Sequence, residues 1–227
     1  MFKKTVSMIC CVIFLQGCSQ EQEVKKEMTN METSLLAATE KQETNTVISL
    51  LKKGADINIT DSKGRTPLMI ATYKNDVKTA KALIEAGADV NIQDDMKNNP
   101  FLYAGAEGYL HILKLTIDAG ADPSLTNRYG GTALIPASEH GYIDVINELL
   151  TRTSVDVNHV NNLGWTALME AIVLSNGNET QQQQVIRLLI EHGADVTIPD
   201  NDGVTPLEHA RAHNFEEIEK ILLEGRK

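Results

Sequence analysis

Apolar residues recur along most of the chain at helical spacing, in short stretches separated by polar turns. Val77, Ala80 and Leu83 are three residues apart, so they fall on one face of a helix and predict a buried stripe. Leu68 and Ala71, in a shorter stretch before them, have the same spacing. The polar segments between such stretches carry Asp, Asn, Ser and Gly, which are typical turn residues. The pattern therefore predicts pairs of short helices joined by tight turns.

Two short motifs recur through the chain in a fixed phase. The first is Thr66-Pro67-Leu68, and its copies begin at Asn99, Thr132, Thr166 and Thr205. These starting positions are separated by 33, 33, 34 and 39 residues. The second motif is Gly-Ala-Asp, and its copies begin at Gly54, Gly87, Gly120 and Gly193. A period of this length indicates stacked units that bury their apolar faces against one another.

The residue types in the two motifs explain where each helix begins and ends. Thr66 is of a type that caps helices, and Pro67 suits the first helical position, where its missing N–H costs nothing. Gly87 follows the predicted second helix, and glycine readily adopts the left-handed conformation that ends a helix. Each unit is therefore expected to hold one helix after the first motif and another before the second.

These motifs resemble the ankyrin repeat, and the segments GRTPLMIA, GADVNIQD and GWTALMEA come close to its consensus. The resemblance covers about residues 31 to 226 and implies an all-α solenoid with short β-hairpin loops. About six helix-turn-helix repeats would then stack as one domain over 31–227, at 31–63, 64–96, 97–129, 130–163, 164–202 and 203–227. Packing by leucine, isoleucine and alanine also agrees with an aromatic content of only 4%.

Two repeats depart from the common length. One additional residue lies between Leu150 and Asn158, and the usual Gly-Ala pair is missing there, so this loop should take a different path. In the fifth repeat, six additional residues fall within 176–184, between the two predicted helices. This insertion is either a neutral loop extension or a segment that contacts a partner.

The first residues predict an export signal rather than a folded element. Lys3 and Lys4 precede an apolar stretch that is too short to span a bilayer but fits the core of a signal peptide. The segment Leu15-Gln16-Gly17-Cys18 resembles a bacterial lipobox, from which Gln16 departs mildly. The resemblance implies a signal peptide at 1–17, a lipidated Cys18, and a flexible tether at 18–30. An ordinary secretory signal is the alternative.

Lipidation of Cys18 would attach the protein to the extracytoplasmic face of a cell membrane, at the cell surface or facing the periplasm. The type of bacterial envelope stays open. Cys10 and Cys11 would be lost with the leader, leaving Cys18 as the remaining cysteine. The mature chain would then have no pair for a disulfide and no thiol for catalysis. With 21 basic and 31 acidic residues, the formal charge of -10 argues against binding to nucleic acid.

No catalytic motif stands out, so we expect no enzymatic activity, no cofactor and no metal. The exception to weigh is the pair His209 and His213, which are four residues apart and could share a metal ion. Two ligands alone do not close such a site. An enzyme or metal-dependent module is therefore the weakest of the alternatives.

The resemblance implies binding of a protein partner through the loop tips and the concave face of the first helices. Mapped onto this chain, that surface comprises Lys63, Arg65, Tyr73, Lys74, Met96, Asn98, Arg128, Tyr129, Glu139, His140, Leu163 and Trp165. Arginine, tyrosine and tryptophan are enriched at binding hot spots. Trp165 could instead pack against the neighbouring loop.

The leading hypothesis is a monomeric, membrane-anchored module that binds an unknown protein outside the cytoplasm. One alternative is a factor that protects a cell-envelope enzyme or confers immunity to a toxin. Another is a secreted effector directed at a host. The residues do not identify the partner.

Overall fold

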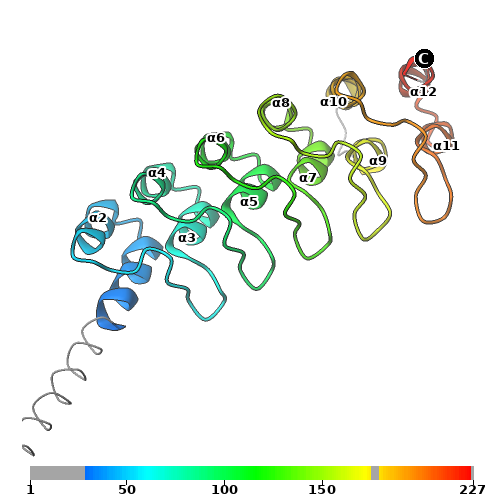
Figure 1. The fold of residues 1–227 in the computed structure, drawn as a ribbon. Helices are drawn as coiled ribbons and strands as arrows, with labels where there is room; N and C mark the ends of the chain where they lie inside the picture. Colours follow the sequence, from blue (N-terminus) through cyan, green and yellow to red (C-terminus); the bar gives the residue numbers. More distant parts are fainter. Residues whose placement is uncertain (1–28, 175–178, 226–227) are drawn as a thin grey trace, which may run out of the picture.

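The computed structural model describes residues 29–174 and 179–225, which form an elongated stack of helix pairs (Figure 1). The predicted signal peptide, Cys18 and most of the predicted tether lie outside the described residues. The first described helix covers residues 29–40, so it includes two positions that we had assigned to the tether. Within the described part of the chain, the helices form six pairs, as the repeats predict.

The first helices of the repeats form one layer, which we call the inner row. After residues 29–40, the inner row consists of α3 (Pro67–Tyr73), α5 (Pro100–Ala106), α7 (Leu134–Glu139), α9 (Ala167–Val173) and α11 (Pro206–Ala212). Each of these helices packs against the next one in the row. The row is therefore built by contacts between adjacent repeats.

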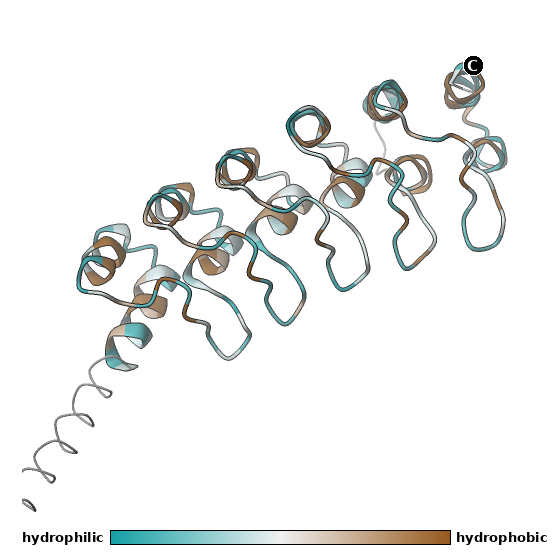
Figure 2. Ribbon diagram, in the orientation of Figure 1, coloured by the Kyte–Doolittle hydropathy of each residue, from teal (hydrophilic) through white to brown (hydrophobic). Residues whose placement is uncertain are grey.

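The second helices form a parallel layer, the outer row (Figure 1). It consists of α2 (Thr44–Lys52), α4 (Val77–Glu85), α6 (Leu110–Asp118), α8 (Ile143–Arg152), α10 (Glu179–Glu191) and α12 (Glu216–Glu224). Each packs against its neighbour in the outer row, and α4, α6, α8, α10 and α12 pack against the inner-row helix of the same repeat. Buried apolar side chains from both rows form one core cluster, and Figure 2 shows apolar residues in the helices of both rows.

The core follows the predicted pattern of small and aliphatic side chains. Leu68, Ala71, Ala80 and Leu83 are fully buried, and equivalent leucines and alanines continue through the stack. Phe101 is the one aromatic residue in the core of the described chain. Because small side chains let helices approach closely, this core needs few aromatic residues.

The predicted helix ends are confirmed at several repeats. The Thr66 Oγ1 accepts a hydrogen bond of 3.1 Å from the backbone N–H of Met69, and Pro67 occupies the first helical position. Gly87 has a φ of +93°, in the left-handed region that favours glycine. At α7, however, Ala133 is already in the helical conformation and Thr132 Oγ1 is buried without a hydrogen-bond partner. The first residue of the first motif therefore caps the inner-row helix in some repeats but does not cap α7.

The loops that follow the outer helices turn at polar tips but form no β-strand within the described residues. Each tip is a tight turn closed by hydrogen bonds, such as the one that Asp61 N–H donates to Arg65 O at 3.1 Å. Adjacent tips are also joined, for example by Asp95 N–H and Lys63 O at 3.1 Å. The expected β-hairpin loops are thus present as hairpin-shaped turns.

The two repeats that differ in length from the others also differ in structure. Helix α8 ends at Arg152, and Thr153 is extended instead of left-handed, so the fourth loop does take a different path. Residues 179–184 of the insertion are helical, which makes α10 longer than α4; residues 175–178 lie outside the described chain. We expected a loop, but Gln182 Nε2 donates to Ala171 O and Ile172 O at 2.9 and 3.0 Å and fixes the helix against α9.

No helix among the described residues combines the length and the apolar character that crossing a bilayer requires.

Candidate functional site

Exposed apolar side chains stand at equivalent positions on successive loop tips. Met96, Tyr129 and Leu163 each lie three residues before the start of the first motif, and they are 39%, 56% and 58% exposed. Large apolar side chains that are exposed in a row are typical of interaction sites. We call the surface formed by these tips and the adjoining parts of the inner-row helices the tip face.

The tip face holds a hollow of about 440 Å³ at the second and third repeats. It brings together four of the predicted binding residues, Lys63, Arg65, Tyr73 and Met96. The Tyr73 hydroxyl donates a 2.5 Å hydrogen bond to Asp94 Oδ2, a residue that sequence reasoning missed. Burial and, after it, this hydrogen bond to Asp94 raise the pKa of Tyr73 to about 12. The tyrosine is therefore a neutral, fixed wall of this hollow.

Asn98 belongs to the same arrangement but supports it rather than lining it. Its Nδ2 donates to the Tyr73 hydroxyl at 3.3 Å, and its backbone N–H donates to Asp94 Oδ1 at 2.9 Å. The contact with Tyr73 holds the second loop tip against α3, and the bond to Asp94 closes the turn of that tip.

The cations Arg65 and Lys74 are both paired within the chain. Glu40 accepts from Arg65 at 3.0 Å and from Lys74 at 2.9 Å, and Arg65 also meets Asp61 at 2.6 Å. The hydrogen bond from Lys74 is the largest cause of a lowered pKa of the Glu40 carboxyl. Glu40 carried no signal in the motifs, because it lies at the end of the first helix of the atypical first repeat. These two positive charges are thus balanced locally.

A second hollow of about 240 Å³ lies farther along the tip face, between the third and fourth repeat loops. The predicted residues Tyr129, Glu139 and Leu163 line it, together with Glu170 and Leu174. We call it the acidic hollow.

Arg128 connects the acidic hollow to the preceding tip. Its guanidinium lies over the ring of Tyr129, 4.6 Å from the ring centre. It also donates to Met96 Sδ at 3.1 Å. These contacts link three of the predicted residues along the tip face.

Glu170 is the functional candidate that sequence reasoning missed. Its side chain is buried, with 4% of its surface exposed, and its Oε1 accepts a hydrogen bond from Asn161 Nδ2 at 3.0 Å. Burial, with the negative charge of Glu139 as a second cause, raises the pKa of Glu170 to about 7. The signal was available in the segment TALMEA, where a glutamate replaces the residue that is Ile70 in the second repeat.

Five of the predicted residues line neither hollow: Lys74, Asn98, Arg128, His140 and Trp165. His140 is exposed at the end of α7, and its ring is 5.4 Å from the ring of Tyr142. Trp165 is half-buried, and its backbone N–H and C=O are bonded to Asn161 in the turn of its own loop. The structure therefore places Trp165 beside the acidic hollow without making it part of the lining.

The histidine pair considered as a metal site is engaged in other contacts. His209 Nε2 lies 2.7 Å from Asp200 Oδ2, and His213 Nδ1 lies 2.8 Å from the carbonyl of His209. Among residues 29–174 and 179–225, no group of three or more potential ligands could hold a metal ion.

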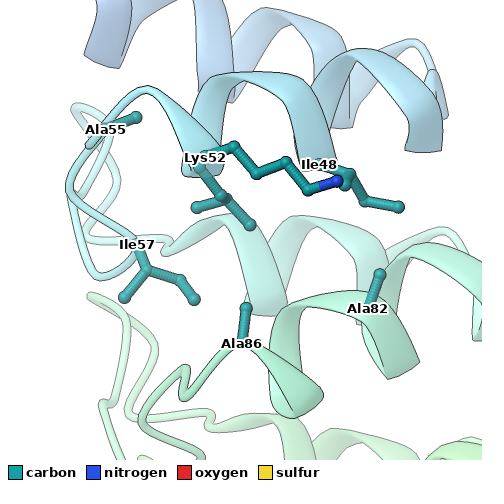
Figure 3. A pocket seen from close by; sticks show the side chains of 7 residues that line it. Ile48, Lys52, Ala55, Ile57, Ala82 and Ala86 are labelled. Carbon is teal, nitrogen blue, oxygen red and sulfur yellow. The ribbon is translucent and has the colours of Figure 1, made fainter.

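A third hollow, of about 360 Å³, lies between α2 and α4 in the outer row. Figure 3 shows Ile48 and Lys52 on one side of it and the small side chains of Ala82 and Ala86 on the other. It is lined mainly by apolar side chains. None of the predicted binding residues belongs to it.

Comparison with solved structures identifies close relatives of the whole array. An ankyrin repeat domain from Acinetobacter baumannii AYE is 49% identical, covers 84% of this chain and 96% of its own, and has a TM-score of 0.81. The ankyrin repeat protein EF0377 is 41% identical over 85% of this chain and 97% of its own, also with a TM-score of 0.81. The ankyrin repeat domain of Bcl-3, at 22% identity and a TM-score of 0.74, shares the fold.

Among curated proteins, the putative ankyrin repeat protein YahD of Escherichia coli (strain K12) is 48% identical over 79 residues. These are 35% of this chain and 39% of YahD, so the match spans about two fifths of that relative. A model of ankyrin repeats in three copies matches residues 5–94 and 101–197. The chain therefore belongs to the ankyrin repeat family, whose members are non-enzymatic modules that typically bind other proteins.

Proposed function

We propose that the protein is a bacterial lipoprotein that binds another protein outside the cytoplasm. Cys18 would hold it at a membrane, and the tip face would contact the partner. The observation that carries the binding proposal is the row of exposed apolar side chains Met96, Tyr129 and Leu163. A row of this kind loses contact with water when a partner covers it, and such burial stabilises a complex.

The predicted anchor is supported by the lipobox-like segment that ends at Cys18. The test is metabolic labelling of bacterial cells with a palmitate analogue, followed by separation of membranes from soluble protein. We expect labelled protein in the membrane fraction, and unlabelled precursor after Cys18→Ser. Wild-type protein that is soluble and unlabelled would contradict the anchor and leave the binding proposal untouched.

The binding proposal is tested by photo-crosslinking in the cell. A benzophenone amino acid placed at Leu163, which is 58% exposed, should give a discrete cross-linked product. The same probe at Lys81 is the matched control, because this side chain is 59% exposed but lies on the outer row. Tyr129→Ala should reduce the product at Leu163. Equal products from both probe positions would argue against a specific tip face.

A further inference from the structure

The acidic hollow combines apolar walls with two carboxylates on adjacent inner-row helices. Leu163 and Leu174 are 58% and 38% exposed, and Tyr129 lies on the preceding tip. Glu139 is at the end of α7 and Glu170 lies in α9. A hollow built this way can surround an extended aliphatic group and also meet a positive charge.

The Glu170 side chain is positioned by a rigid neighbour. Asn161 Oδ1 accepts hydrogen bonds from the backbone N–H groups of Leu163 and Trp165 at 2.9 and 3.0 Å. These bonds fix the orientation of the amide, so that Asn161 Nδ2 donates to Glu170 Oε1. No described residue donates a hydrogen bond to Glu170 Oε2. This oxygen is also not fully enclosed by the protein. Oε2 is therefore left without a hydrogen bond from the described residues, in a residue that lines the hollow.

The two carboxylates also lack a counter-charge among the residues that the structure describes. Neither Glu139 nor Glu170 forms an ion pair with a described residue. The next repeat shows the contrast, since Asp200 and His209 stand at the positions of Asn161 and Glu170 and lie 2.7 Å apart. A buried carboxylate without a counter-charge is unfavourable, so a cation from outside the chain would stabilise it.

We propose that the acidic hollow binds a lysine or arginine side chain of the partner protein. This inference rests on the proposed function as a protein-binding module. The charged end of the side chain would lie between Glu139 and Glu170, and its methylene groups would pack on Leu163 and Leu174. Basic side chains combine these two properties, since their long apolar stems bury while the charged end finds polar partners. A charge-assisted hydrogen bond to Oε2 would add orientation.

The elements around α9 bring few other charges to this place. Helix α7 contributes Glu139, which acts on the pKa of Glu170. Helix α10 contributes Gln182, whose amide is bonded to backbone carbonyls of α9. Helix α11 contributes His209, which faces Asp200. A metal ion is a poor alternative occupant, because the described residues offer no cluster of three potential ligands.

The test is an NMR titration of the full-length protein in detergent with two blocked amino acids of similar size. Nα-acetyl-lysine methylamide should shift the methyl signals of Leu163 and Leu174, with a dissociation constant on the order of 1 mM. Nα-acetyl-norleucine methylamide has the same stem without the charge, and it should leave these signals unchanged at the same concentrations. Equal shifts with both probes, or no shift with lysine, would overturn the inference.

Two conservative variants identify the charges involved. Glu170→Gln keeps the acceptor oxygen for Asn161, so its fold should persist, and it should weaken lysine binding about tenfold. Glu139→Gln should also weaken it. Lysine binding equal to wild type in the double variant would refute the role of the carboxylates.

The cross-linked product at Leu163 separates this inference from the proposed function. If the double variant Glu139→Gln/Glu170→Gln forms as much product as wild type, the proposed binding of a basic side chain is contradicted, while the proposal of protein binding stands. If no product forms with wild type, the proposed function itself fails. If the product is lost in the double variant but retained in the control Glu107→Gln, on the neighbouring repeat, the inference is supported.

Discussion

Gly105 occupies a place where two inner-row helices meet without room for a side chain. It lies in α5, against the start of α7. A Cβ added at Gly105 would lie 2.8 Å from Ala133 Cβ, 3.3 Å from Ala133 O and 3.4 Å from Ala133 Cα. Ala133 is fully buried, and two of these three atoms belong to the backbone. Relief of the contact would therefore require α5 and α7 to move apart.

Gly105→Ala should lower the free energy of unfolding. In a helix interior, alanine is favoured over glycine by about 1 kcal/mol. Overpacking of a well-packed core costs about 1–3 kcal/mol, and here rigid backbone atoms put the cost at the upper end. The cost of overpacking exceeds the gain in helix propensity, so we expect the free energy of unfolding to fall by about 1–2 kcal/mol.

The measurement is equilibrium urea denaturation followed by far-UV circular dichroism. Gly131→Ala is the matched control, because the nearest atom to its added Cβ is Asn127 Oδ1 at 3.6 Å, an ordinary contact distance. That change should be neutral or stabilising by about 0.4–1 kcal/mol. In Gly105→Ala/Ala133→Gly the clash is removed, so the two changes should be coupled favourably by about 1 kcal/mol. A midpoint for Gly105→Ala at or above that of wild type would refute the reasoning.

Three further predictions concern capping, the core and the buried acid. Leu134 is fully buried, so Leu134→Ala should lower the free energy of unfolding by about 2–5 kcal/mol in the same urea assay; an unchanged midpoint would contradict its core position. Thr66→Ala should cost about 1 kcal/mol because it removes the hydrogen bond to Met69, whereas Thr132→Ala should cost little because its hydroxyl has no partner. Glu170 has a pKa raised from 4.5 to about 7, so the folded state binds the extra proton and loses stability as the pH rises between these values. Glu170→Gln should therefore be more stable than wild type at pH 8, by up to about 3 kcal/mol, and equal to it near pH 4; a difference independent of pH would count against the raised pKa.

The fold could be predicted from the sequence because its determinants are local and repeated. Thr66, Pro67 and Gly87 mark helix ends through their own conformational preferences, and the helical spacing of Ala80 and Leu83 marks a buried face. The start of α10 could not be predicted in this way. Its sequence is rich in glutamine, and the stabilising contact is made by Gln182 to carbonyls of another helix, a contact that no local pattern reports.

From the sequence, the candidate site could be predicted only as a surface along the loop tips, and not as a set of contacts between side chains. Loop position was enough to place Met96, Tyr129 and Leu163 on exposed tips. Which side chains pair with one another depends on how the repeats pack together, and this packing is not visible in the sequence. The contact of Arg65 with Glu40 spans 25 residues, for example, and the shared surroundings of Glu139 and Glu170 arise from the packing of α7 against α9.

The charge of the tip face follows from pairing rather than from composition. The basic residues Arg65 and Lys74 lie at one end of this face, and Glu40 and Asp61 together balance their charges. No described cation pairs with the carboxylates of Glu139 and Glu170, which lie partly or fully out of water, where electrostatic interactions are stronger than at the surface. An overall charge of -10 describes neither end. The acidic hollow is thus the place on the tip face where the charge of a partner side chain should matter most.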